Sequence, residues 1–164
     1  MTQEQVKVLL SRLIEEMDMQ CGIISERFDT SAISGFRANA KNIRFFMQLI
    51  RLHQGRTAVE TPAKFKKLYM LAAVMQDSQN ELLEMMANEV LTLAKNTKLN
   101  EVIAEAQAEW RRTYAKNIME KLGKMLLSHN YDNIPPAIFN NFFSRIANSS
   151  SPDAKEKEVT AGEQ

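Results

Sequence analysis

The sequence predicts an all-helical protein, an antiparallel up-and-down bundle of four long helices followed by a short C-terminal helix. Three observations support this prediction. The 164 residues include only five Gly and four Pro, too few for the many turns of a sheet protein of this size. Apolar residues recur at three- and four-residue steps over long segments, as on the buried face of an amphipathic helix. The segments between them are short, which favours antiparallel neighbours.

The first helix is expected from Thr2 to Arg27, because one apolar stripe runs through this segment at helical spacing. The second is expected to start between Asp29 and Ser34, in a stretch rich in N-cap residues. It is expected to end near His53, where a Gln-Gly pair supplies a stop signal. The stripe of the first helix consists of Val6, Leu9, Leu10, Leu13, Ile14, Met17, Cys21 and Ile24.

A third helix is expected to open at Thr61-Pro62, with Thr as N-cap and Pro at the first helical position. Its apolar pattern extends as far as Lys95. An uninterrupted helix of this length is unusual, so a bend is expected around Gln76 to Asn80. The fourth helix is expected from about Asn100 to Ser128.

A short fifth helix is expected from Ala137 to Ile146, after Pro135-Pro136. The five helices then make one domain, residues 1–147. Residues 148–164 are polar and low in hydrophobic residues, so they are expected to form a disordered tail.

The composition predicts a cytoplasmic protein. Because Cys21 is the single cysteine, no internal disulfide can form. The first residues carry charge and do not resemble a signal peptide. No apolar run approaches the length needed to span a bilayer, so no membrane partner is expected.

The residues needed for catalysis are not grouped in the sequence, and we expect the protein not to be an enzyme. His53 and His129 lie at predicted helix ends, where capping or solvent exposure is the commoner role. Cys21 lies on an apolar stripe, as a small buried hydrophobic residue does. No Glu-x-x-His pair and no Gly-rich phosphate loop occurs. Neither a metal nor another cofactor is expected.

Charge is distributed unevenly along the chain. Residues 30–75 contain eight Lys or Arg and one acid, for a net charge of +7 in a chain whose total is +1. Within the second helix, basic residues and one Gln step by four, three, four and three, so that they share an arc of about 80°. This ridge is either a solvated face or an anion site. The predicted anion-binding residues are Arg37, Lys41, Arg44 and Arg51, extended by Lys64 and Lys67 from the next helix.

Two segments resemble motifs of the CHAD family, the conserved histidine α-helical domain. The stretch SGFRANAKNIRFFMQLI, residues 34–50, resembles the family's signature helix, with Arg37, Lys41 and Arg44 at its basic positions. The stretch LAAVMQDSQ, residues 71–79, resembles the Leu-rich helix that ends in Arg-Asp, and Asp77 matches its acid.

The chain also departs from the family pattern. Ser34 stands where the family has its His, and Asn42 and Gln76 stand where it has Arg. The resemblance implies a helical fold made of two similar four-helix halves around a basic channel that binds inorganic polyphosphate or related polyanions. The chain is about half as long as a family domain, which implies a homodimer that rebuilds the whole.

Three functions are compatible with the sequence. The first is a non-enzymatic module that binds polyphosphate or another polyanion through the basic ridge. The alternative is a protein-interaction or scaffolding bundle that has lost anion binding, with Phe139, Phe142 and Phe143 as a contact surface if they are not buried in the core. Nucleic-acid binding ranks last, because the ridge lacks interleaved aromatic residues and no recognition-helix motif is present.

Overall fold

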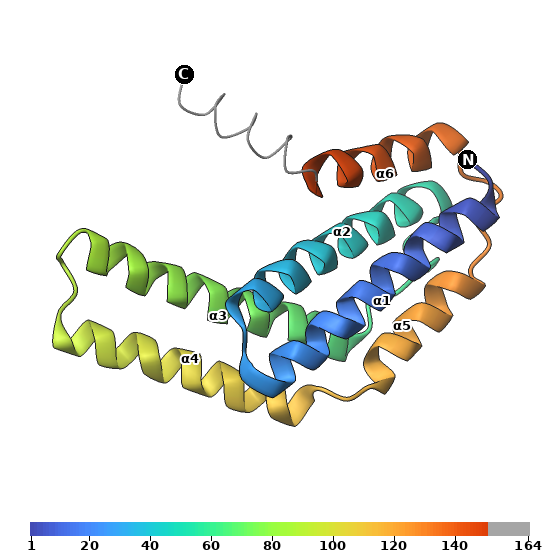
Figure 1. The fold of residues 1–164 in the computed structure, drawn as a ribbon. Helices are drawn as coiled ribbons and strands as arrows, with labels where there is room; N and C mark the ends of the chain where they lie inside the picture. Colours follow the sequence, from blue (N-terminus) through green and yellow to red (C-terminus); the bar gives the residue numbers. More distant parts are fainter. Residues whose placement is uncertain (151–164) are drawn as a thin grey trace, which may run out of the picture.

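Six helices make up the described part of the chain, residues 1–150, in the computed structural model (Figure 1). No strand occurs among these residues, so the all-helical class is confirmed. The predicted count of four long helices and one short helix is wrong. The helices are α1 (Gln3–Arg27), α2 (Thr30–Gln54), α3 (Ala63–Ala87), α4 (Leu93–Thr113), α5 (Asn117–Ser128) and α6 (Pro136–Ser150).

The bounds of α1 and α2 agree with the sequence pattern because local capping fixes them. The Thr2 side chain accepts a hydrogen bond from the Gln5 backbone N–H, and the Gln5 side chain accepts one from the Thr2 N–H, which is a complete capping box. Phe28 ends α1 in a left-handed conformation with φ 49°. Asp29 then caps α2 by accepting from the Ala32 N–H at 3.0 Å. Gly55 ends α2 with φ 106°, a value that favours glycine.

The chain reverses later than the sequence pattern predicts. Helix α3 passes through residues 76–80 without interruption and ends at Ala87, and the helix that follows begins at Leu93. The turn between them contains Glu89 in a left-handed conformation with φ 55°. Thr92 caps α4 by accepting a hydrogen bond from the Lys95 N–H at 3.2 Å. The predicted third helix therefore covers α3, this turn and the start of α4.

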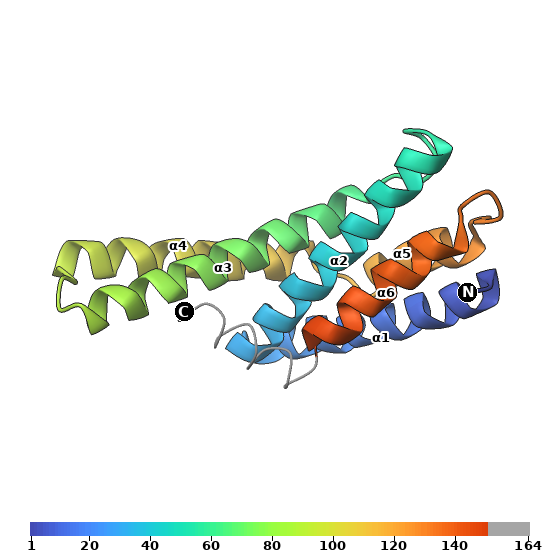
Figure 2. The same ribbon diagram turned by 90° about the horizontal axis from the view of Figure 1, so that it is seen from above.

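The predicted fourth helix is divided between α4 and α5. The break at residues 114–116 follows Trp110, which is fully buried and donates from Nε1 to Ser25 Oγ of α1 at 3.0 Å. After the break the chain continues away from the hairpin, so that α5 lies along α1 and runs antiparallel to it (Figures 1 and 2). A tertiary contact with α1 thus lies at this helix end.

Helix α6 covers α2 through aromatic packing. The ring centroid of Phe46 on α2 lies between 5.4 and 6.0 Å from those of Tyr131, Phe139 and Phe142. Phe139 and Phe142 are buried and Phe143 is half-buried. These aromatic residues therefore form part of the core rather than an exposed contact surface.

The predicted tail begins inside α6. Residues 148–150 belong to this helix, which extends past the predicted end at Ile146. The remaining residues, 151–164, lie outside the described part of the chain. None of the helices formed by residues 1–150 is long and apolar enough to cross a membrane.

The hairpin of α3 and α4 projects from the rest of the molecule (Figures 1 and 2). Among the described residues, the main hydrophobic core has no member between Met75 and Ala106. We call residues 76–105 the arm. Its own helices hold it together, through buried Leu99 and Ile103 and an ion pair of 3.3 Å between Lys95 and Glu81.

Candidate binding surface

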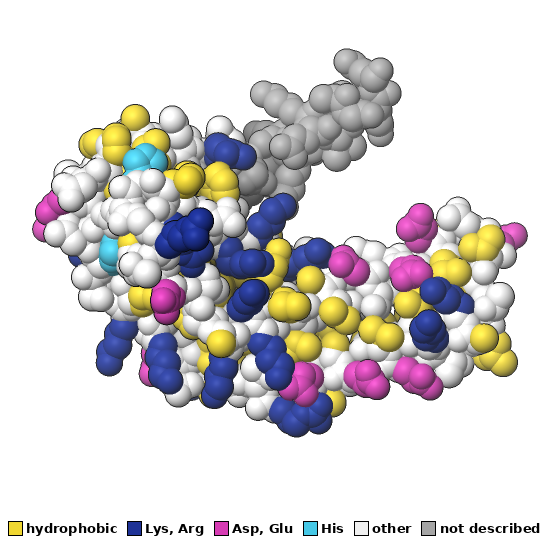
Figure 3. All heavy atoms as spheres, turned by 180° about the vertical axis from the view of Figure 1, so that it is seen from behind, with side chains coloured by type: hydrophobic (Ala, Val, Ile, Leu, Met, Phe, Trp, Pro, Cys, Tyr) yellow, Lys and Arg dark blue, Asp and Glu magenta, His cyan; other side chains and the backbone are white. Residues whose placement is uncertain are grey.

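Basic side chains gather where the hairpin leaves the rest of the molecule, and acidic side chains predominate on the arm (Figure 3). We call the first region the basic elbow. The arm contains six acids and two lysines, for a net charge of −4, directly after the segment of +7. The charge asymmetry seen in the sequence is therefore also an asymmetry in space. The basic elbow comprises Arg37, Lys41, Arg44, Arg51, Lys64, Lys66 and Lys67.

Arg37 is held by α3. Its Nη1 atom donates to the Asp77 carboxylate at 2.7 Å and to Gln76 Oε1 at 3.0 Å. The two segments that resemble the family motifs meet at this contact. This ion pair joins α2 to α3 and occupies one of the predicted anion-binding cations. The other guanidinium nitrogens of Arg37 have no hydrogen-bond partner among the described residues.

Of the predicted anion-binding residues, Arg51 has two of its donor nitrogens bound to the protein itself. Its Nε donates to the Val59 carbonyl at 2.8 Å, and Nη2 donates to Thr61 Oγ1 at 2.9 Å. Both acceptors lie in the loop between α2 and α3. Arg51 therefore holds this loop against α2, and its planar donor fork suits that task.

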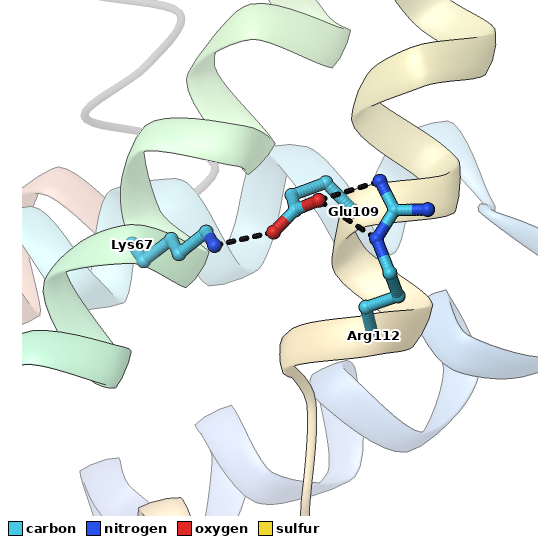
Figure 4. A network of polar contacts seen from close by, with 3 residues as sticks. All are labelled: Lys67, Glu109 and Arg112. Carbon is cyan, nitrogen blue, oxygen red and sulfur yellow. Dashed lines mark hydrogen bonds and ion pairs between the residues drawn. The ribbon is translucent and has the colours of Figure 1, made fainter.

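Lys67 lies in a three-residue network (Figure 4). Its ammonium donates to one Glu109 oxygen, and Arg112 donates to the other from Nε at 2.9 Å and from Nη2 at 2.6 Å. These hydrogen bonds, first from Lys67 and then from Arg112, lower the pKa of Glu109 to about 2. Glu109 thus neutralises much of the charge that Lys67 brings to the surface.

The other predicted residues are more open. The Arg44 guanidinium lies over the Tyr69 ring, with its carbon 4.8 Å from the ring centroid. Lys41 and Lys64 are exposed, and neither has an ion pair or side-chain hydrogen bond within residues 1–150. Lys66, which the sequence argument did not select, is open in the same way. The structure therefore brings the predicted cations together on one side, but about half of them already have protein partners.

A second feature escaped the sequence argument, a stripe along the exposed face of α3. Its six positions step by four, four, three, four and three, and share an arc of about 80° opposite the buried face. Met70 and Val74 lie in it with 56% and 41% of their surface exposed. We call this set the α3 stripe, and its members are Lys66, Met70, Val74, Asp77, Glu81 and Glu84. The sequence does contain a signal for this stripe, because its six residues recur at the same three- and four-residue steps as the apolar residues of the buried face.

The arm tip carries further exposed apolar side chains. Six of the ten large exposed hydrophobic residues in the described chain lie between Met70 and Leu93. On α3, Leu83 and Met86 continue the helical face that buries Phe65 and Leu68 nearer the core. The apolar pattern of the buried face thus continues to a place where none of the helices formed by residues 1–150 covers these two side chains. The members at the tip are Leu83, Met86, Val90 and Leu93.

The residues with catalytic potential remain separate. Burial raises the pKa of the Cys21 thiol, with a smaller contribution from Asp18. His53 Nδ1 lies 2.9 Å from the Leu49 carbonyl at the end of α2. No group of three His, Cys, Asp or Glu side chains that could hold a metal ion occurs among the described residues. Two grooves, one between α1 and α6 and one between α1 and α5, are lined by none of the predicted anion-binding residues.

The geometry is therefore that of a binding surface with a basic and an acidic region joined by exposed apolar side chains. Comparison with known proteins adds no assignment: no protein-family model, no curated protein and no solved structure matches the chain.

Proposed function

We propose that the protein is a non-enzymatic protein-interaction module, and that the arm together with the basic elbow forms its binding surface. The observation that carries the proposal is the concentration of exposed apolar side chains on a projecting hairpin. Contiguous exposed apolar surface typically indicates a contact with another protein. Leu93, 82% exposed at the arm tip, is the most extreme case.

The contacts of the basic residues favour a protein partner over inorganic polyphosphate. Arg37 and Lys67 are paired with carboxylates, and Arg51 holds a loop. Arg37 and Lys67 therefore offer less charge to a free anion than the sequence implies, and Arg51 offers fewer free donors. One open cation, Lys66, lies next to the exposed apolar side chains of Met70 and Val74 on the same helix face. An acidic, amphipathic helix satisfies both kinds of side chain, whereas a polyphosphate chain satisfies only the cations.

Photo-crosslinking in the producing cells tests the proposal. A photoreactive amino acid replaces Leu83 or Met86 in the full chain, and a matched control replaces Met19, which is 61% exposed on α1. We expect covalent protein adducts from the arm positions and none from Met19. Equal adduct formation at all three positions, or none at the arm, contradicts the proposal.

Polyanion binding is a second candidate function, supported by the open cations Lys41, Arg44 and Lys64 and by the resemblance to the CHAD family. Calorimetric titration with long-chain polyphosphate tests it. Binding that weakens steeply with salt is expected, because released counterions drive the association. Lys41→Ala/Arg44→Ala should reduce binding, and the exposed control pair Lys121→Ala/Lys124→Ala on α5 should not. Absent or salt-insensitive binding excludes this candidate.

A further inference from the structure

The α3 stripe carries a gradient of charge and polarity. Lys66 lies at its N-terminal end, Met70 and Val74 lie in the middle, and Asp77, Glu81 and Glu84 lie at its C-terminal end. All six positions are exposed, so the stripe is one accessible strip of helix surface. Its ends are 18 residues apart in sequence, which corresponds to about 27 Å along the helix.

The two ends of the stripe are complementary to each other. If two copies of α3 lie antiparallel with a two-fold axis near residue 75, Lys66 of each copy faces Glu84 of the other. Val74 then lies one residue from the axis and packs against its symmetry mate, with Met70 on either side. A parallel arrangement would instead place Lys66 beside Lys66 and Glu84 beside Glu84. The charge pattern therefore selects the antiparallel arrangement.

The ion pairs within the chain agree with this arrangement. Asp77 is already paired with Arg37, and Glu81 with Lys95. Lys66 and Glu84, at the two ends, have no ion pair with any described residue. On a larger scale, the same arrangement brings the acidic arm of one copy to the basic elbow of the other. The net charges of these regions are −4 and +7, so the long-range field also favours this contact.

We propose that the chain forms a two-fold symmetric dimer through the α3 stripe, with Lys66–Glu84 ion pairs at both ends and Val74 and Met70 at the centre. The inference rests on the proposed function and names a second copy of this chain as the partner. A single helix face is a small interface, so the dimer is expected to be weak and to depend on concentration.

Two charge-reversal variants of the full chain, Lys66→Glu and Glu84→Lys, test the dimer in sedimentation equilibrium over a wide concentration range. Both residues are exposed and have no ion pair within residues 1–150 to lose, so both variants should fold as the wild type does. Each reversal creates two like-charge contacts in the homodimer and should raise its Kd at least about tenfold. Salt should weaken the wild-type dimer.

Mixing the two variants is the decisive measurement. In the mixed dimer, one end pairs the original Lys66 with the original Glu84, and the other end pairs the two reversed residues. Both ends are then complementary, so the 1:1 mixture should recover a dimer that neither variant forms alone. Lys121→Glu on α5 and Glu16→Lys on α1 are matched controls with the same charge changes at exposed positions outside the arm and the basic elbow, and they should leave the wild-type Kd nearly unchanged.

A wild-type chain that stays monomeric overturns the inference, as does a pair of variants that still dimerise or whose mixture does not recover the dimer. The crosslinking experiment separates this failure from failure of the proposed function. Adducts between the arm and a different protein, with the chain itself monomeric, retain the interaction module and exclude self-association. Adducts of twice the chain's mass from a photoreactive amino acid at Met70, within the stripe itself, support the dimer.

Discussion

Arg37 on α2 donates a hydrogen bond of 2.7 Å to the carboxylate of Asp77 on α3, across 40 residues of sequence. It is the one ion pair that joins α2 to α3 among the described residues, and it lies next to the point where the arm begins. The side chains are 32% and 65% exposed, so water screens the attraction. This contact therefore positions the hairpin more than it stabilises the fold.

A double-mutant cycle with Arg37→Ala and Asp77→Ala should give a coupling energy below about 1 kcal/mol, as is usual for exposed ion pairs. Urea denaturation followed by the fluorescence of Trp110, the single tryptophan, measures it. Added salt should reduce the coupling. A coupling of several kcal/mol would show that the pair is a main support of the α2–α3 packing.

Arg51→Ala should cost more, about 1–3 kcal/mol in the free energy of unfolding. The substitution removes a charged donor, so that two acceptors in the α2–α3 loop lose their hydrogen bonds. Arg51→Lys should recover little, since one ammonium cannot reproduce the fork that reaches both Val59 and Thr61. Lys41→Ala on the same helix is the control and should be nearly neutral. Equal losses at the two positions would contradict the structural role of Arg51.

Phe46→Ala should destabilise the protein by about 3–5 kcal/mol, because Phe46 is fully buried at the centre of the aromatic cluster that holds α6. The neighbouring Phe45→Ala should cost clearly less, since Phe45 is exposed on one side. Thermal unfolding of the two variants gives the comparison. Similar melting temperatures would mean that α6 contributes little to the core.

The low pKa of Glu109 predicts that the stability of the fold decreases in acid in a specific pH range. Its pKa is about 2 in the folded chain against an ordinary value of 4.5. The unfolded chain therefore binds a proton first as the pH falls. The stabilisation from Glu109 is complete above about pH 4.5 and is lost as the pH falls towards about 2. Urea denaturation from pH 5 to pH 2 should show a shallower loss of stability for Glu109→Gln than for the wild type.

The arm should open independently of the core. Hydrogen exchange is expected to be faster for amides of residues 76–105 than for those in the middle of α1 and α2, because beyond the Arg37 contacts at its base the arm is held mainly by packing between α3 and α4. Leu99→Ala should accelerate exchange in the arm and leave the core amides nearly unchanged. Uniform acceleration over the chain would show that arm and core unfold together.

The sequence predicts α1 and α2 well because their ends are set by residues within one turn, such as the Thr2 capping box and Asp29. It misses the turn after α3, since that turn has neither Gly nor Pro and places Glu89 in a conformation that glycine usually adopts. The break after Trp110 is missed for a different reason: its contact is with Ser25, 85 residues away.

The candidate surface is predictable only in part. Helical spacing correctly places Arg37, Lys41 and Arg44 on one helix, since that is a local property. Their partners come from other helices, so the sequence pattern does not reveal that Asp77 pairs with Arg37 or that Tyr69 lies under Arg44. Exposure of Met70 and Val74 also depends on where the remaining helices end.

Because α3 runs unbroken from the core to the arm tip, it acts as a rigid lever with a fixed rotational phase between its two halves. Inserting one residue after Gln79 would turn the tip by about 100° relative to Phe65 and Leu68 and advance it by about 1.5 Å. A different side of α3 would then face solvent at the tip, and α4, which returns to the same core through Ala106 and Trp110, would lose its register against α3. The number of residues in α3 thus sets which of its side chains the arm presents.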